Sequence, residues 1–276
     1  MNTPLQRTEI KSLALICSAH MVSHIYYLVL IPLFPMLKAH LGLGYVELGL
    51  AITLYNIVGG LAQTPMGYAV DRFGARRVLI CGLLLGGSAY ISIGLFPYYP
   101  WMLCAMALGG VANAVYHPAD YAILGSVIEP SRLGKAFSIH TFAGFLGSAI
   151  TPIVMLVAAE AFGFRTAILA AGVLGLAVAV PLAMAGWLDR HAASGAQAGA
   201  AAHIPMRQLL TPTVFGLVGF FTLLSLSSGA LTNYSAVALT TLYGFTLSAA
   251  NVALSEIGRA SSRAACRSRW SPTPYQ

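Results

Sequence analysis

Charged residues are scarce in this sequence. Of its 276 residues, 8% are Asp, Glu, Lys or Arg and 58% are hydrophobic, and the mean hydropathy is +0.77. Apolar runs repeatedly exceed the length that a soluble core needs. The composition therefore indicates a protein that lies in a lipid bilayer.

Sequence motifs of enzymes, metal sites and nucleic-acid-binding proteins are also missing. The sequence has no CxxC pair, no HExxH and no serine in a nucleophile motif, and no basic helix with interleaved aromatic residues. We therefore expect no enzyme, no cofactor, no metal site and no nucleic-acid partner. The four cysteines are isolated, three of them in apolar runs, and are interpreted as packing residues: Cys17, Cys81, Cys104 and Cys266.

The apolar runs have the length of membrane-spanning helices. About 20 apolar residues cross about 30 Å of hydrocarbon as a helix. We predict an all-α polytopic membrane protein with seven spans and an aborted eighth, which begins near Leu247 and ends after Leu254. The predicted spans are 13–37, 45–70, 78–96, 101–128, 136–158, 167–187 and 214–239.

The basic residues fall mainly on one side of these spans. Cytoplasmic loops collect Lys and Arg, which predicts a cytoplasmic N-terminus and a first span that is retained and is not a cleaved signal peptide. Only Lys38 and Arg165 then lie outside. The cytoplasmic set is Arg7, Lys11, Arg72, Arg76, Arg77, Arg132, Lys135, Arg190 and Arg207.

The chain divides into four parts. We predict a six-helix bundle over 1–187, a cytoplasmic Ala/Gly-rich linker over 188–210, and the start of a second bundle over 211–254. The last part, 255–276, carries four arginines and looks non-native, because EIGRAS at 256–261 resembles the start of an adaptor-encoded tail.

A charged loop follows the second span, where 67–77 reads GYAVDRFGARR. Glycine lets a neighbouring helix approach closely, and Asp71 can accept charge-assisted hydrogen bonds from the arginines beside it. The loop is predicted to act as a conformational latch; the alternative is that its arginines are only topology anchors. The latch residues are Gly67, Asp71, Arg72, Gly74, Arg76 and Arg77.

A second loop of the same kind, EPSRLGK at 129–135, joins the fourth and fifth spans on the same side. Its charged residues, Glu129, Arg132 and Lys135, are expected to pair with Asp71 and the latch arginines. Such exposed pairs are worth at most about 1 kcal/mol each. Their expected role is therefore to bias two conformations.

The latch spacing resembles the signature loop of the major facilitator superfamily of secondary transporters. The stretches 20–38, 54–77 and 113–124 further resemble its fosmidomycin-resistance branch, which comprises bacterial inner-membrane efflux proteins. The resemblance implies a small-molecule substrate held near the midplane between two six-helix halves, proton coupling, and alternating access. It also implies that the second half, needed for function, is cut short here.

Two features depart from the antiporter pattern of that superfamily. The fourth span has Ala105, Met106 and Ala107 where many proton antiporters carry an arginine, and Thr151 precedes Pro152 where a Gly-Pro pair is expected. Both weaken the prediction of drug–proton antiport without excluding it.

A few ionisable residues lie inside the predicted spans, where they are costly and usually face a polar cavity. Histidine changes charge near neutral pH and can carry a proton together with a carboxyl group. We predict proton coupling by His117, Asp120 and His24; the alternative is that the histidines only bridge helices. His140, on the fifth span, receives no role. The predicted substrate cavity is lined by His20, His24, Asn56, Asn113 and Tyr116.

Three functions remain open from the sequence. The first is a secondary transporter, which either exports small organic molecules or takes up a metabolite. The second is a membrane hydrolase, for which Asn113, His117 and Asp120 lack a nucleophile. The third is a nonfunctional fragment.

Overall fold

The computed structural model describes residues 6–189 and 211–256, so most of the predicted linker and tail lies outside the described residues. The described residues form helices and no strand, as the all-α prediction requires. Residues 247–256 form a helix where the eighth span was expected to begin. The other elements are α1 (Arg7–Leu28), η1 (Ile31–Leu33), α2 (Phe34–Leu41), α3 (Tyr45–Phe73), α4 (Ala75–Leu95), α5 (Tyr99–Val127), α6 (Pro130–Phe162), α7 (Phe164–Met184) and α10 (Pro212–Tyr243).

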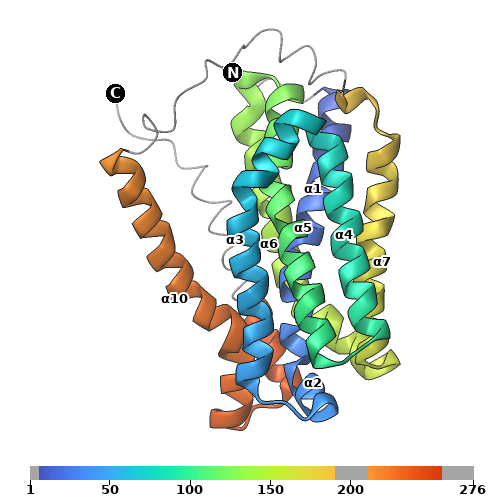
Figure 1. Ribbon diagram of the computed structural model, residues 1–276, viewed down its shortest axis with the longest axis vertical. Helices are drawn as coiled ribbons and strands as arrows, with labels where there is room; N and C mark the ends of the chain where they lie inside the picture. The colour runs from blue at the N-terminus through green and yellow to red at the C-terminus, as the bar shows by residue number, and fades with distance from the viewer. Residues whose placement is uncertain (1–5, 190–210, 257–276) are drawn as a thin grey trace.

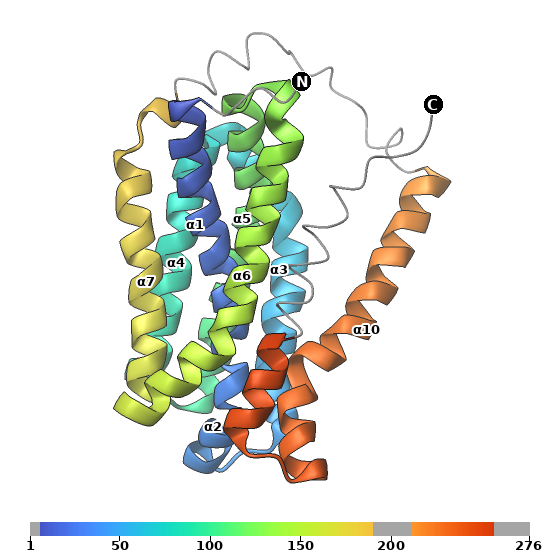
Figure 2. The same cartoon turned by 180° about the vertical axis from the view of Figure 1, so that it is seen from behind.

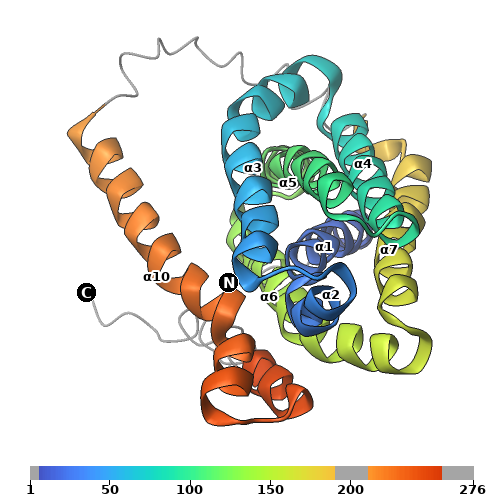
Figure 3. The same cartoon turned by 60° about the horizontal axis from the view of Figure 1, so that its bottom comes forward.

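The helices α1 and α3 to α7 stand side by side as one bundle (Figure 1). Viewed toward its lower end, α1 and α5 lie inside a ring made by α3, α4, α6 and α7 (Figure 3). The first part of helix α10 stands away from the bundle, and its last part lies against the lower end of the bundle near α2, in both side views (Figures 1 and 2). The buried core is therefore that of the first six spans.

The first predicted span, 13–37, is broken. Helix α1 ends at Leu28, and the chain continues through the 3-10 turn η1 into α2. Pro32 and Pro35 lie in this region, and proline removes a backbone donor and restricts the residue before it. The break therefore follows from local sequence, and the segment still continues in one direction.

Each predicted span coincides with a helix, but five helical segments among the described residues are long and apolar enough to cross a membrane, against seven predicted spans. The five are Arg7–Leu41, α3, α4, α6 and α7. Helix α5 is 29 residues long and contains Asn113, His117 and Asp120, whose polarity explains why it is not among them. In α10, the segment Pro212–Ser227 is apolar but shorter than the 18 residues of a candidate span.

Single glycines make the tightest turns of the bundle. Gly74 separates α3 from α4 with φ +90°, and Gly163 separates α6 from α7 with φ +83°. Residues with a Cβ rarely adopt this backbone conformation. Gly74, predicted as part of the latch, thus has a defined conformational role.

Close packing of α4 on α7 depends on glycine. A Cβ added at Gly87 of α4 would lie 2.8 Å from the carbonyl oxygen of Gly172 of α7, and one added at Gly172 would lie 2.7 Å from the carbonyl oxygen of Gly87. Both neighbours are backbone and cannot move aside. Small residues that let helix backbones approach are typical of membrane bundles.

Replacing Gly87 by alanine should therefore destabilise the bundle by about 1–3 kcal/mol, the usual cost of overpacking. The matched control is Gly60→Ala on α3, where an added Cβ meets nothing within 4 Å. That change should leave stability equal or higher, because alanine is the better helix former. Thermal unfolding of both variants in detergent measures the difference. Equal melting temperatures would contradict the packing of α4 on α7.

Candidate functional site

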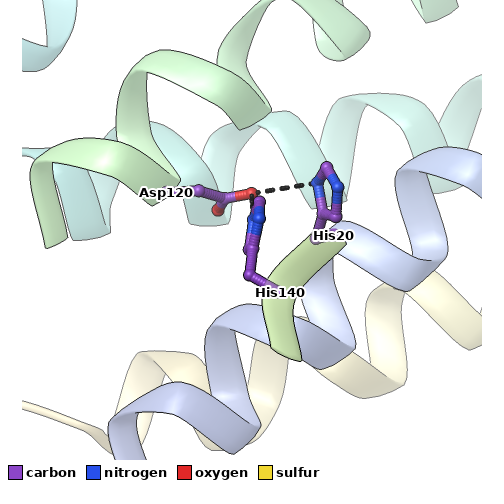
Figure 4. Close-up of side chains that lie close together, drawn as sticks. All are labelled: His20, Asp120 and His140. Carbon is purple, nitrogen blue, oxygen red and sulfur yellow. Dashed lines mark hydrogen bonds and ion pairs between the residues drawn. The ribbon is translucent and has the colours of Figure 1, made fainter. Parts of the chain in front are cut away.

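Two imidazole side chains meet one carboxylate inside the bundle (Figure 4). His20 of α1 places Nδ1 3.3 Å from Oδ2 of Asp120 on α5, and His140 of α6 places Nε2 3.0 Å from the same oxygen. Each of the three residues is at most 3% exposed. This set, hereafter the Asp120 cluster, joins α1 to the consecutive helices α5 and α6.

The two imidazoles of the Asp120 cluster also stack on each other. The ring centroids of His20 and His140 lie 3.8 Å apart with an interplanar angle of 23°. The stacking therefore packs α1 directly against α6 at the level of Asp120.

Two further histidines surround this centre. The rings of His24 and His117 lie 4.8 Å and 5.4 Å from that of His20, measured between centroids. Nδ1 of His24 lies 2.9 Å from Oγ of Ser148 on α6. His117 is exposed and His24 is partly buried. These two side chains connect the buried centre with a more open face of the bundle.

A glycine that the sequence analysis did not single out makes room for these rings. A Cβ at Gly144 of α6 would lie 2.7 Å from Nε2 of both His20 and His24. Helix α6 can therefore approach α1 at this level only with glycine here. The sequence contains many glycines, and nothing in it marks Gly144 as the one that this close packing requires.

The imidazoles that lie within 3.3 Å of the Asp120 carboxylate are those of His20 and His140, and the proton-coupling role of His117 stays a prediction. His117 stands on the same helix as Asp120, and its ring opens to the surface. The facing helices α1 and α6 supply the partners. His20 was predicted only to line a cavity, and His140 had been noted without a role.

The remaining cavity candidates differ in exposure. Asn56 is exposed and Asn113 is partly buried, so both are accessible from outside the bundle. Tyr116 is only 2% exposed, and its hydroxyl has no hydrogen-bond partner among the described residues. The role of Asn56, Asn113 and Tyr116 in a substrate cavity stays a prediction.

Arg76 of the predicted latch binds an acid that follows the neighbouring helix α7. Its Nε and Nη2 donate to Oδ2 of Asp189 at 3.0 and 2.6 Å, and Nη1 donates to the carbonyl oxygens of Leu182 and Ala183 at 3.3 and 2.8 Å. Arg76 thus ties the start of α4 to the end of α7, where helix carbonyls lack intrahelical partners.

Asp71 was expected to accept hydrogen bonds from the latch arginines. For Arg76 this expectation was wrong, because its guanidinium binds Asp189. The guanidinium of Arg76 lowers the pKa of the Asp189 carboxyl by hydrogen bonding to it. A carboxyl with a lowered pKa keeps its charge at neutral pH, so the pair persists there and weakens only on acidification. The sequence analysis missed Asp189, since nothing in its position 113 residues beyond Arg76 connects the two.

The other latch residues, except Gly67, line a cavity of about 630 Å³ at this end of the bundle. Asp71 is exposed at its edge, and Arg72 donates a 3.4 Å hydrogen bond to the hydroxyl of Tyr68. The lining combines both signs of charge and comes from α3, α4, α5 and the end of α7: it includes Asp71, Arg72, Gly74, Arg76, Arg77, Ser126 and Asp189.

The second charged loop also pairs differently from the prediction. Nη2 of Arg132 on α6 lies 2.9 Å from Oε1 of Glu9 on α1, and Nη1 lies 2.6 Å from Oε2 of Glu129. The backbone N–H of Glu129 also donates to Glu9, at 3.0 Å. Glu9 and Arg132 are 5% and 7% exposed. Arg132 therefore links the starts of α1 and α6, in place of the expected bond to Asp71.

The Asp120 cluster also has the donor atoms of a metal site. His20, Asp120 and His140 each offer one ligand atom, and these atoms all lie within 4.8 Å of one another. The sequence analysis expected no metal ligand, because the three residues form no recognisable spacing along the chain.

Comparison with known proteins gives consistent matches. The sequence profile described as Major Facilitator Superfamily matches residues 16–267. The fosmidomycin resistance protein of Escherichia coli (strain K12) is 24% identical over 162 residues, 59% of this chain and 40% of that protein. The bacillibactin exporter of Bacillus subtilis (strain 168) is 24% identical over 151 residues, 52% of this chain and 38% of that protein. The chain thus spans about two fifths of the length of these relatives.

Solved structures share the fold. A bacterial homologue of the human lysosomal transporter Spinster, inward-facing and occupied, superposes with a TM-score of 0.75 at 13% identity, over 94% of this chain and 60% of that one. The D-xylose-proton symporter superposes with a TM-score of 0.67 at 17% identity, over 92% of this chain and 67% of that one. At these identities the likeness concerns the arrangement of helices.

The two acids that bind Arg132 should differ in importance. Glu9→Gln removes a buried carboxylate that accepts bonds from Arg132 and from the backbone of Glu129, and leaves the guanidinium with less compensation. Glu129→Gln, the matched control, changes a carboxylate that is 54% exposed. We expect Glu9→Gln to lower the melting temperature in detergent clearly more than Glu129→Gln. The reverse order would show that Glu9 does not hold α1 to α6.

Proposed function

Because the chain belongs to the Major Facilitator Superfamily, we propose that it forms part of a secondary transporter that exports small organic molecules in exchange for protons by alternating access. The family consists of membrane transporters, so the expected superfamily and the all-helical polytopic fold are confirmed and the hydrolase hypothesis is set aside. Substrate, direction and coupling ion are proposals. Export is favoured because two of the relatives are named as a drug-resistance protein and an exporter.

Asp120 carries the proposal of proton coupling. Its side chain is completely buried and its Oδ2 faces two imidazoles, and an isolated carboxylate in a membrane interior is costly. A group in this position that gains or loses a proton changes its attraction for His20 and His140. Proton exchange at Asp120 would therefore change how α5 is held to α1 and α6, which is what coupling to a conformational change needs.

The latch supports the alternating part of the proposal. Asp71 and the three arginines beside it lie around a cavity where α3, α4 and α7 meet. In the proposed cycle, contacts of Asp71 with the second half favour one of two conformations, while Arg76 keeps α4 and α7 together. We also propose a bacterial inner membrane location with a cytoplasmic N-terminus, since this places the latch and Arg132 in the cytoplasm.

Replacing Asp120 by asparagine tests the proposal. Transport of fosmidomycin is measured in inverted membrane vesicles with an imposed proton gradient, using the longest gene product that carries this sequence. Asparagine keeps the shape but cannot exchange a proton, so gradient-driven transport should fall at least about tenfold, a change of about 1.4 kcal/mol in the coupled equilibrium, while substrate exchange without a gradient persists.

The matched control is Glu160→Gln, an exposed acid on α6 outside the Asp120 cluster. This variant should transport like the unmodified protein. If Asp120→Asn also retains full gradient-driven transport, Asp120 does not carry the coupled proton. If neither the unmodified protein nor Glu160→Gln moves fosmidomycin in either direction, the proposed export does not include this compound, and the assay is repeated with the substrates of the other exporters in the family.

A further inference from the structure

We propose that the Asp120 cluster is a binding site for a divalent transition-metal ion of the zinc type, with His20 Nδ1, Asp120 Oδ2 and His140 Nε2 as ligands (Figure 4). The proposal concerns binding at equilibrium and does not depend on transport. It rests on the distances between the three atoms, on polar atoms left without partners, and on the chemistry of the donors.

The distances fit a tetrahedral ion. Zinc binds imidazole nitrogen and carboxylate oxygen at about 2.0–2.2 Å, so two ligand atoms of one tetrahedron lie about 3.3 Å apart. The two imidazole nitrogens lie 3.3 and 3.0 Å from Asp120 Oδ2, and all three atoms lie within 4.8 Å of one another. For an ion to bind all three atoms, the stacked rings of His20 and His140, whose centroids lie 3.8 Å apart, have to open so that both nitrogens point at it.

Two buried atoms of the cluster lack a hydrogen bond. His20 Nδ1 faces Asp120 Oδ2 at 3.3 Å without hydrogen-bond geometry, and Asp120 Oδ1 has no partner among the described residues. Both residues are at least 97% buried. Buried polar atoms normally have partners, and a metal ion would engage both the nitrogen and the carboxylate.

Two imidazoles and one carboxylate are ligands typical of zinc and of divalent iron. Three protein ligands leave a fourth position, as in zinc sites that keep an open place for water. The more open His24 and His117 lie 4.8 and 5.4 Å from His20, measured between ring centroids. Both side chains are less buried than the three proposed ligands.

The ion would bridge α1, α5 and α6 through one ligand each. It would also supply positive charge next to a carboxylate that is otherwise balanced only by histidine. We therefore expect bound metal to hold the three helices together and to raise the melting temperature of the chain, since a ligand that binds the folded state stabilises it.

The test uses Co²⁺ as a spectroscopic probe on the purified 276-residue chain in detergent. His191, His203 and Cys266, which lie outside the described residues, are replaced by Gln, Gln and Ser to remove other ligands. Absorption in the visible range should reveal one four-coordinate Co²⁺ per chain, and Zn²⁺ should displace it. X-ray absorption should show two imidazole nitrogens and one carboxylate oxygen.

His20→Gln, Asp120→Asn and His140→Gln should each weaken Co²⁺ binding at least about 100-fold, since even changes behind the ligands cost 10–100-fold in metal sites. His40→Gln is the matched control, because His40 is an exposed histidine on α2. It should leave affinity unchanged. Circular dichroism checks that each variant is folded.

Three outcomes would overturn the proposal. The first is the absence of four-coordinate Co²⁺ in the chain that carries only the replacements of His191, His203 and Cys266. The second is Co²⁺ binding that survives each of the three ligand changes, and the third is an X-ray absorption spectrum with sulfur or a single imidazole. The spectrum of the chain with intact ligands keeps the test decisive even if a ligand variant does not fold. None of these outcomes bears on the transport assay, so metal binding and proton coupling can be rejected separately.

Discussion

The structure depends on how the carboxylate of Asp120 is compensated inside an apolar, membrane-spanning bundle. An uncompensated charge in such surroundings is expensive, and the group must find a partner or lose its charge. Asp120 meets this constraint through imidazoles from α1 and α6. The inner helices of the bundle are therefore joined by an interaction whose strength depends on protonation, and the proposed coupling follows from that dependence.

Arginines organise one end of the bundle. Arg76 joins α4 to the end of α7, and Arg132 joins α6 to the start of α1. These contacts hold neighbouring helices as pairs, while Asp71 stays exposed at the edge of the latch cavity. The two arginines thus fix this end of the bundle, and in the proposed cycle Asp71 is the acid that contacts the second half.

The sequence predicted what depends on local composition. Runs of about 20 apolar residues located the helices because crossing a bilayer needs that length, and the charged loop after the second span indicated the family. The break after Leu28 also has a local cause in Pro32.

Partners across the bundle could not be predicted in this way. Arg76 and Asp189 are 113 residues apart, and Arg132 and Glu9 are 123 apart. The predictions instead chose charged neighbours in the same loop, or on the same helix as with His117 and Asp120. Which helices face each other is decided by close packing, for example at Gly144, and a single sequence carries little information about such contacts.

A double-mutant cycle between His140 and Asp120 tests the central claim most directly. The free energy of unfolding is measured for the unmodified chain, His140→Gln, Asp120→Asn and the double variant. If the carboxylate holds α6 through this imidazole, the two changes should be non-additive by at least about 0.5 kcal/mol. Additive effects would mean that the two residues do not interact, and would contradict the account.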